Sequence, residues 1–346
     1  MKVFSTQYLI IGAGLAGSVL AFLLSRSGSE VILAEILDAK TKDKLCGGIV
    51  PSPALQIFEK IYGENPQQVL PLHKVKGFRQ RFAGKEIFVD NAEIFTLPRK
   101  LLDNFVLERA LEVGAKLFDR VALKSVDMNN SLAYFLDLRD KTQFAIRFQF
   151  IIGADGASSK VRTLLTGKRP IIIPTIQFQM PCVSDELIFA YLPEIFSGQI
   201  DWGYCWYIPQ GKIAVVGCGG SSFSRQKNLV QICRNNLKNF CSELGIEQNI
   251  SIRGAAIPID KILLSCNENS FFIGDAAGLN DTGTGGGIYY AFISANLLFE
   301  ALIGAENIRL TYEKKIFNAI QLKTAQQARK SQFLTSITIL KKGSKI

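Results

Sequence analysis

The sequence predicts an α/β protein in which an antiparallel sheet is inserted into a parallel, nucleotide-binding sheet. First, apolar runs at residues 7–12 and 30–35 flank a helical pattern over 15–27, which is the order of a βαβ unit of ~30 residues. Second, two β-rich stretches, 73–98 and 168–258, lie between the later segments that have helical patterns. Third, the length of 346 residues suits roughly two domains of ~100–200 residues each.

The first strand and helix lie in the most apolar N-terminal run, residues 8–24. Gly12, Gly14 and Gly17 interrupt this run, and no small-residue cleavage site follows it. We therefore expect a buried strand and a buried helix that ends near Gly28, in place of a signal peptide or a membrane span.

A glycine-rich turn joins this strand to this helix. Residues 12–17 read Gly-Ala-Gly-Leu-Ala-Gly, and Glu35 ends the next strand, 23 residues after Gly12. This spacing is typical of a dinucleotide-binding turn: the first glycine permits the tight turn, the second admits a pyrophosphate, and the third lets the helix pack closely. The helix N-terminus attracts the diphosphate, and Glu35 is expected to bind the adenosine ribose. The predicted contacts are Gly12, Gly14, Ala16, Gly17 and Glu35.

Two later strands also end in glycine and an acidic residue. Residues 151–156 close with Asp155 and Gly156, and residues 272–278 contain Gly274 and Asp275. Because ligands of open α/β sheets bind beyond the carboxyl ends of the strands, we expect both strand ends to face the cofactor. Asp275 is placed to hydrogen-bond a ribityl or ribose hydroxyl.

The remaining patterns divide the chain into three parts. Alternation over 73–98 predicts an antiparallel hairpin, 99–114 predicts a helix, and one helix near 226–244 interrupts the strands of the third quarter. We expect a discontinuous cofactor-binding domain, a substrate-facing β domain and a basic C-terminal helix. Their boundaries are 1–72, 99–167 and 259–311 for the first, 73–98 and 168–258 for the second, and 312–346 for the third.

Composition argues against several other classes of protein. The seven cysteines form no CxxC pair and His73 is the only histidine, so we expect neither a metal centre nor a disulfide framework. This cysteine usage is typical of reduced cytoplasmic thiols. The net charge is +10, but eight basic residues follow the last acidic residue, Glu313. The rest of the chain is nearly balanced, so the charge does not indicate a nucleic-acid-binding face.

Taken together, the three glycine-rich strand ends resemble one family layout. The chain is similar to the FAD-dependent group that contains aromatic hydroxylases, flavin halogenases and geranylgeranyl reductases. The stretches 153–156 and 274–275 carry this resemblance. It implies a Rossmann-type FAD-binding domain of the glutathione reductase/p-hydroxybenzoate hydroxylase kind, with an inserted antiparallel substrate domain. It also implies FAD as the resident cofactor and a flavin contact from Arg99.

Three further stretches resemble the geranylgeranyl reductases within this group. Residues 44–48 resemble their cysteine-diglycine loop near the flavin, and 203–209 resemble the tyrosine-x-tryptophan-x-x-proline element of their substrate cavity. Residues 284–291 resemble their glycine-rich loop, whose backbone N–H groups would face the N1/O2 edge of the flavin. The site residues implied are Cys46, Gly47, Gly48, Tyr204, Trp206, Gly285, Gly286, Gly287 and Ile288.

Several of these residues also have a purely structural interpretation. Cys46 is equally a small packing residue, and Tyr204 and Trp206 belong either to a cavity wall or to an ordinary core. His73 is interpreted as structural. The chain departs from the reductases where two of their prolines are replaced, by Asp201 and Thr282, and this concerns the substrate more than the fold.

The resemblance implies a reductase that transfers hydride from reduced flavin to a carbon–carbon double bond of an isoprenoid or another apolar substrate. Cys46, Tyr204 and Trp206 are the expected catalytic residues, with Tyr204 or Cys46 near the proton path. NAD(P)H or ferredoxin is the expected external electron donor. The alternatives are a monooxygenase or halogenase acting on an aromatic substrate, and a non-catalytic protein that binds flavin or prenyl lipid. Residues 204–209 differ little from a halogenase stretch, but the catalytic lysine of halogenases has no convincing counterpart.

The basic C-terminal segment has two interpretations. It is either a solvated helix, expected over 312–342, or a peripheral contact with an anionic membrane. The second interpretation rests on apolar residues interleaved with lysines, namely Phe333, Leu334, Ile337, Ile339 and Leu340. We expect a cytoplasmic protein, with peripheral membrane association as the alternative.

Overall fold

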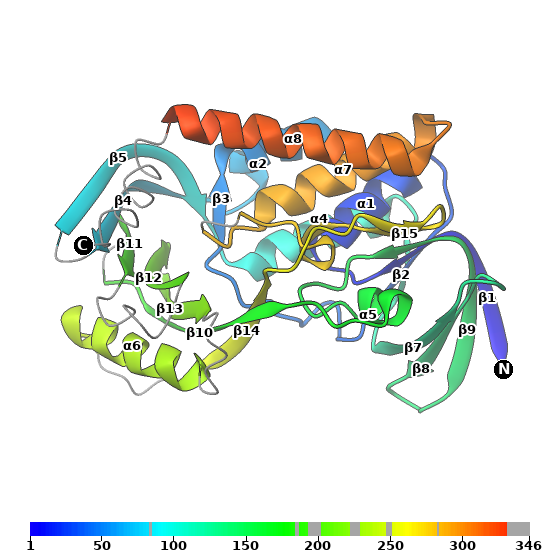
Figure 1. The fold of residues 1–346 in the computed structure, drawn as a ribbon, viewed down its shortest axis with the longest axis horizontal. Helices are drawn as coiled ribbons and strands as arrows, with labels where there is room; N and C mark the ends of the chain where they lie inside the picture. Colours follow the sequence, from blue (N-terminus) through cyan, green and yellow to red (C-terminus); the bar gives the residue numbers. More distant parts are fainter. Residues whose placement is uncertain are drawn as a thin grey trace, which may run out of the picture. The chain divides into compact units, whose positions relative to one another are not determined.

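The computed structural model describes residues 1–82, 85–183, 187–192, 202–221, 229–246, 251–281 and 284–330. The chain forms two compact units, residues 1–296 and 297–346, and each is described by itself. The larger unit contains two sheets (Figure 1).

The first sheet is the predicted parallel one. Its strand order is β15-β16-β9-β1-β2-β6, with β8 and then β7 attached beside β9. The parallel strands are β1 (Lys2–Ile11), β2 (Val31–Ala34), β6 (Lys116–Phe118), β9 (Gln143–Gly153) and β16 (Ser270–Phe272). The antiparallel strands are β7 (Val121–Asp127), β8 (Leu132–Asp137) and β15 (Ser265–Asn267).

Helix α1 (Leu15–Arg26) follows β1 as predicted. All its residues except Arg26 are buried, as expected for a helix that is apolar on every side. Gly28 then adopts a left-handed φ of +87°, which glycine tolerates and other residues rarely adopt. The βαβ unit therefore ends its helix where the sequence indicated.

The second sheet has the order β14-β10-β13-β12-β11-β4-β5-β3. Its strands are β3 (Ile49–Pro51), β4 (His73–Phe82), β5 (Lys85–Thr96), β10 (Ile172–Pro181), β11 (Leu187–Leu192), β12 (Trp202–Gln210), β13 (Ile213–Ser221) and β14 (Arg253–Pro258). The β4–β5 pair confirms the predicted hairpin. The pairs are antiparallel except β11–β4, which is parallel, because a long connection brings β11 back beside the hairpin.

The strands of this sheet come from the two segments assigned to the substrate domain and from β3 in the cysteine-diglycine region. The expected domain boundaries themselves stay a prediction. One face of the sheet is covered by α6 (Leu229–Glu243), the helix expected near 226–244. Buried residues of β12 and β13, such as Tyr207 and Val216, pack there against Leu237 and Phe240. Alternate residues of β12 face the other way, and this opposite face carries the site described below.

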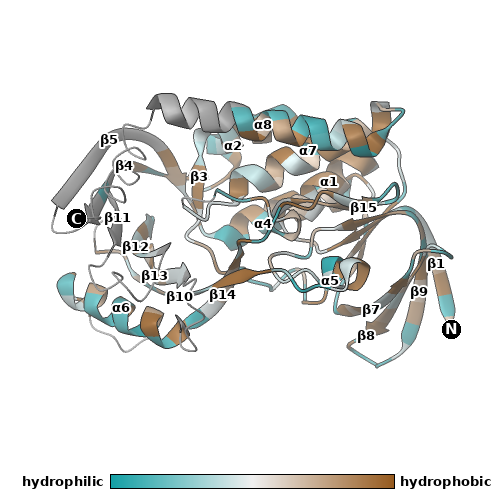
Figure 2. Cartoon of the chain, viewed as in Figure 1, coloured by the Kyte–Doolittle hydropathy of each residue, from teal (hydrophilic) through white to brown (hydrophobic). Residues whose placement is uncertain are grey.

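Five further helical segments lie in the described part of the larger unit before Ile288. They are α2 (Ser52–Tyr62), α3 (Pro66–Val69), α4 (Arg99–Glu112), α5 (Lys160–Thr166) and the 3₁₀ turn η2 (Gly274–Ala277). β2, β16 and the carboxyl ends of β1 and β9 are continuously buried, in keeping with a sheet covered on both faces there, and Figure 2 shows much of this sheet as hydrophobic.

The smaller unit contains the C-terminal part of α7 (Ile288–Gly304) and the helix α8 (Ile308–Lys330). The predicted C-terminal helix thus begins four residues earlier than expected. Residues 331–346 lie outside the described residues, so the membrane contact inferred from Phe333 to Leu340 stays a prediction. Among the described residues, no helix combines the length and apolar character needed to cross a membrane.

Candidate active site

The β1–α1 turn is held by very close backbone packing. Gly12 has a φ of +105°, and a Cβ atom built on it would lie 2.5 Å from the Ala154 carbonyl oxygen. A Cβ on Gly17 would lie 2.0 Å from the Gly12 carbonyl oxygen. These two positions accept only glycine, and they bring the end of β9 against the first turn of α1. Neither lines the cavity described below, so their contribution is to the shape of the turn.

Glu35 lies at the end of β2 and braces the same turn. Its Oε2 accepts a hydrogen bond from Ala13 N (3.0 Å) and its Oε1 accepts one from Leu37 N (3.1 Å). Lys42 Nζ lies 2.9 Å from Oε2 in a buried ion pair and also donates to the Ala13 carbonyl. The expected bond from Glu35 to a ribose stays a prediction. Lys42 had no signal in the sequence, because a lysine in a loop has no diagnostic spacing.

A cavity of about 180 Å³ opens where the ends of the first sheet meet the second sheet. It brings together most of the predicted site residues from segments far apart in the sequence. The predicted residues that line it are Gly14, Ala16, Cys46, Gly47, Gly48, Arg99, Gly156, Tyr204, Trp206, Gly274, Asp275, Gly285, Gly286, Gly287 and Ile288. Gly12, Gly17, Glu35 and Asp155 are outside this lining.

Asp155 is directed to a neighbouring helix. Its carboxylate accepts hydrogen bonds from the Ser159 hydroxyl (2.5 Å) and from the backbone N–H groups of Lys160 (2.6 Å) and Val161 (3.0 Å). Burial raises the pKa of Asp155, and these hydrogen bonds oppose the shift. The side chain therefore caps α5, and its predicted role toward a cofactor stays a prediction.

Arg99 begins α4 and is the buried cation of the cavity wall. Its Nε donates to Asp103 Oδ1 at 2.9 Å, one helical turn further on. Burial on its own lowers the pKa of Arg99, but the negative charge of Asp103 raises it overall. Asp103 was not predicted as a site residue, although its i,i+4 spacing from Arg99 is a sequence signal for such a pair.

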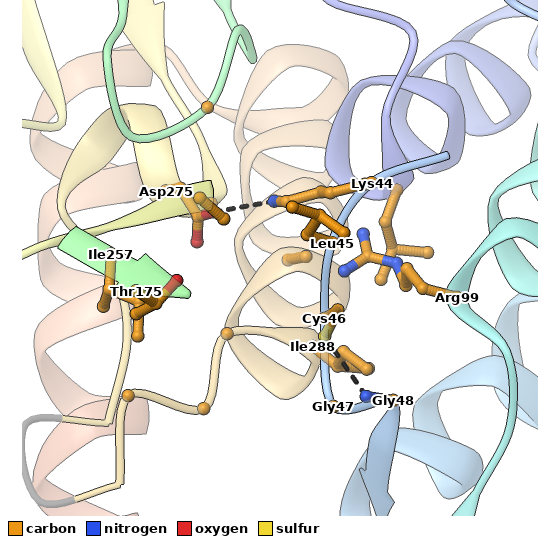
Figure 3. Close-up of a pocket in the computed structure, with 18 of the residues that line it drawn as sticks. Lys44, Leu45, Cys46, Gly47, Gly48, Arg99, Thr175, Ile257, Asp275 and Ile288 are labelled. Carbon is orange, nitrogen blue, oxygen red and sulfur yellow. Dashed lines mark hydrogen bonds and ion pairs between the residues drawn. The ribbon is translucent and has the colours of Figure 1, made fainter. Parts of the chain in front are cut away.

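Asp275 and Lys44 form an ion pair at the cavity (Figure 3). Lys44 Nζ lies 2.8 Å from Asp275 Oδ2, and this contact joins residues 231 positions apart in the chain. A Cβ on Gly287 would lie 2.9 Å from the other oxygen, Asp275 Oδ1. The glycine loop therefore passes directly over the carboxylate of η2.

The cysteine-diglycine loop is fixed against the second sheet. Gly48 has a φ of +68°, and a Cβ there would lie 2.1 Å from the Leu97 carbonyl oxygen. Gln210 Nε2 donates to the Gly47 carbonyl at 2.8 Å, and Gly48 N donates to Cys46 Sγ at 3.3 Å (Figure 3). The Cys46 thiol is thus held at the cavity wall by a loop that accepts only glycine at position 48.

Tyr204 and Trp206 are two residues apart on β12 and face the cavity together. Their ring centroids are 5.5 Å apart, and the Tyr204 hydroxyl donates to the Thr284 carbonyl in the glycine loop. Burial raises the pKa of Tyr204, and the nearby negative charge of Asp281 adds to the shift. Tyr204 is therefore neutral and ties the second sheet to the glycine loop. Both residues belong to the wall of a cavity, and Trp206 also packs on Val75.

The residues present fit a dinucleotide. Gly14 caps α1 without any side-chain hydrogen bond, so N–H groups of the first turn are available to a phosphate. Cβ atoms built on Gly14 and Gly156 would meet nothing within 4 Å, so both glycines leave open space beside the turn. Lys44 and Arg99 also line this cavity, where each is paired with a carboxylate. This donor set suits a diphosphate-bridged cofactor.

The fold and this cavity define a two-sheet, dinucleotide-dependent flavoprotein. The chain belongs to the family described as "FAD binding domain", whose family model matches residues 5–183, and it is an FAD-dependent oxidoreductase.

Relatives cover the chain to different extents. It is 25% identical over 302 residues to a digeranylgeranylglycerophospholipid reductase of Methanocaldococcus jannaschii, covering 82% of this chain and 73% of that protein. It is 30% identical over 175 residues to a kynurenine 3-monooxygenase of Xanthomonas oryzae pv. oryzae, covering 47% of this chain and 38% of that protein.

A solved structure supports the fold. The crystal structure of a geranylgeranyl bacteriochlorophyll reductase-like protein from Thermoplasma acidophilum superimposes with a TM-score of 0.78 at 23% identity. The match covers 92% of this chain and 84% of that one. Both sheets of the larger unit therefore belong to the shared fold.

Proposed function

We propose that this protein is a reductase that saturates carbon–carbon double bonds of an isoprenoid or similarly apolar substrate. The single observation that carries the proposal is the cavity itself, which runs from the nucleotide turn to an aromatic and aliphatic wall of the second sheet. That wall includes Tyr204, Trp206, Ile208 and Ile257. An apolar wall of this kind holds an alkene and excludes water, which suits transfer of hydride to carbon.

The extent of the relatives' similarity supports a reductase over a monooxygenase. The reductase relative matches this chain over 82% of its length, whereas the monooxygenase relative matches 47%. A match over 82% of the chain must extend into the second sheet, which is expected to bind the substrate. Function is determined by this site more than by the shared fold.

FAD, when bound, would supply the hydride-transfer chemistry, and NAD(P)H or a ferredoxin is the proposed source of its electrons. The residues proposed to hold it are Gly14 of the β1–α1 turn and the glycines of the 285–287 loop, with Arg99 and Asp275. Gly287 and Ile288 stand at the start of α7, where backbone N–H groups and the helix dipole favour negative charge. Arg99 adds a buried positive charge to the same wall.

The second carbon of the alkene needs a proton, and two cavity residues carry one. The Tyr204 hydroxyl proton is already engaged with the Thr284 carbonyl. The Cys46 sulfur accepts a hydrogen bond from Gly48 N, which leaves its own S–H to point elsewhere. We therefore favour the Cys46 thiol as the proton donor, with Tyr204 positioning the glycine loop.

Anaerobic turnover tests this function. Protein reduced with dithionite and then given prenyl alkenes should lose its reduced-flavin spectrum, and the product mass should rise by two hydrogens. Cys46→Ser should slow this reoxidation without loss of bound FAD. In a parallel turnover with NAD(P)H, O2 and chloride, a product that gains oxygen or a halogen would replace the proposal with a monooxygenase or halogenase. A flavin that no donor can reduce would indicate a binding protein.

A further inference from the structure

Three neighbouring strands present a regular pattern of side chains to the cavity. In the register of the second sheet, residues of β12, β13 and β10 stand directly opposite one another in two adjacent rows. Opposite residues project from the same face of a sheet. The rows are Tyr204–Gly219–Thr175 and Trp206–Gly217–Gln177. Each row thus has an aromatic residue on one side, a glycine in the middle and a neutral polar residue on the other side.

The two central glycines are required by this arrangement. A Cβ on Gly217 would lie 2.4 Å from the Trp206 ring and 2.8 Å from the Ile176 carbonyl oxygen. A Cβ on Gly219 would lie 2.7 Å from Thr175 Cγ2. Because Gly217 and Gly219 have no side chains, the aromatic residues of β12 and the polar residues of β10 approach each other across them. We call these two rows of residues the floor of the cavity.

The polar side chains of this floor are buried, and no hydrogen-bond partner for them is found among the described residues. Thr175, Gln177 and Trp206 are only 6%, 4% and 7% exposed, and all three line the cavity. Trp206 Nε1 is fully buried without a hydrogen-bond partner. In the described part of the chain, no hydrogen bond is made by the Thr175 hydroxyl or the Gln177 amide. Buried polar groups are normally paired, so these three indicate a ligand with a hydrogen-bonding group.

The charges around the floor indicate that this group is neutral. The cations of the cavity lining, Lys44 and Arg99, are each already paired with a carboxylate. The Gln177 row continues into Arg253 on β14, but this guanidinium pairs with Asp43 Oδ2 at 2.7 Å and does not line the cavity. A substrate anion placed on the floor would therefore be desolvated without a free counter-charge.

We propose that Thr175, Gln177 and Trp206 bind an uncharged hydroxyl or carbonyl group carried by an apolar chain, and that this floor discriminates against a diphosphate-terminated chain. The inference rests on the proposed function, whose substrate it specifies. Trp206 Nε1 would donate to the oxygen, and the Gln177 amide and Thr175 hydroxyl would donate to it or accept from it. Figure 3 shows Thr175 beside Ile257 on the wall that this group would approach.

Binding to the oxidised holoprotein tests the proposal with three probes of one chain length. Geranylgeraniol, geranylgeranyl diphosphate and the hydrocarbon that lacks the oxygen are titrated while the flavin absorbance is followed. The alcohol should bind at least about tenfold more tightly than either other probe. Thr175→Val and Gln177→Leu should each remove about tenfold from the alcohol affinity and leave the hydrocarbon within about twofold. Gln179→Leu is the matched control, because Gln179 is an exposed glutamine on the same strand.

The outcomes separate this proposal from the function it rests on. Tightest binding by the diphosphate, equal binding of alcohol and hydrocarbon, no spectral response to any probe, or equal effects of Gln177→Leu and Gln179→Leu would overturn the proposal. An unchanged FAD-to-protein ratio in each variant shows that the fold is intact. If Gln177→Leu loses its flavin, the isosteric Thr175→Val still tests the proposal. If reduced enzyme saturates none of the probes while the alcohol preference persists, the reductase function fails and the floor's specificity stands.

Discussion

Asp103→Asn probes the buried ion pair that places a positive charge on the cavity wall. The side chains of Arg99 and Asp103 are only 6% and 3% exposed, and their contact is 2.9 Å. Asparagine keeps the shape but leaves the Arg99 charge without a counter-charge, which costs about 3–5 kcal/mol in buried pairs. At about 2.1 cal/mol/K of unfolding entropy per residue, 346 residues correspond to about 0.7 kcal/mol/K. The melting temperature should therefore fall by about 4–7 °C.

The matched control is another i,i+4 arginine–carboxylate pair, Arg309 and Glu313, whose side chains are 41% and 38% exposed. Because solvent screens an exposed pair, Glu313→Gln should lower the melting temperature by about 1 °C or less. Thermal unfolding followed by circular dichroism at a fixed FAD concentration compares the two variants. Equal small shifts would refute the argument that Asp103 sustains a buried charge.

Three further predictions concern the turn, the glycine loop and acid stability. Gly17→Ala should abolish FAD retention, because its Cβ would lie 2.0 Å from a backbone oxygen. Gly63→Ala is the control: its Cβ would meet open space, so it should cost only about 1 kcal/mol of stability. The FAD-to-protein absorbance ratio should fall in the first variant and stay unchanged in the second. Tyr204→Phe should speed flavin release in a stopped-flow dilution, since it removes the tether to the glycine loop, and an unchanged rate would contradict that role. The hydrogen bond from Arg120 lowers the pKa of Asp38 to about 2, so its stabilisation is present above the unfolded pKa of 3.8 and is lost as the pH falls toward 2. Asp38→Asn should accordingly show a smaller drop in melting temperature between pH 5 and pH 2.5 than the parent, and an equal drop would exclude the contribution.

Local features of the parallel sheet and its glycine-rich turn could be predicted from the sequence alone. Gly12, Gly17 and the strand–helix–strand order lie within one short segment, so spacing determines their arrangement directly. The Arg99 and Asp103 pair has the same local character. Asp155 shows the limit of this reasoning, because a strand end followed by an acid also serves to cap the next helix.

Features that depend on strand pairing could not be predicted. The floor at Thr175 and Gln177 exists only because β10 and β12 flank β13 in one particular register, and no local pattern specifies that register. The parallel pairing of β11 with β4 joins segments more than 100 residues apart. The Lys44–Asp275 contact likewise spans 231 residues. Long-range contacts of this kind follow from the assembled sheets.

Titration of the flavin-free protein with FAD and with FMN tests the central claim most directly, because only FAD has the adenosine half that the β1–α1 turn and Glu35 would receive. We expect stoichiometric FAD binding, at least about a hundredfold weaker FMN binding, and loss of that preference in Glu35→Ala. Equal binding of the two flavins, or no uptake of FAD at all, would contradict the account.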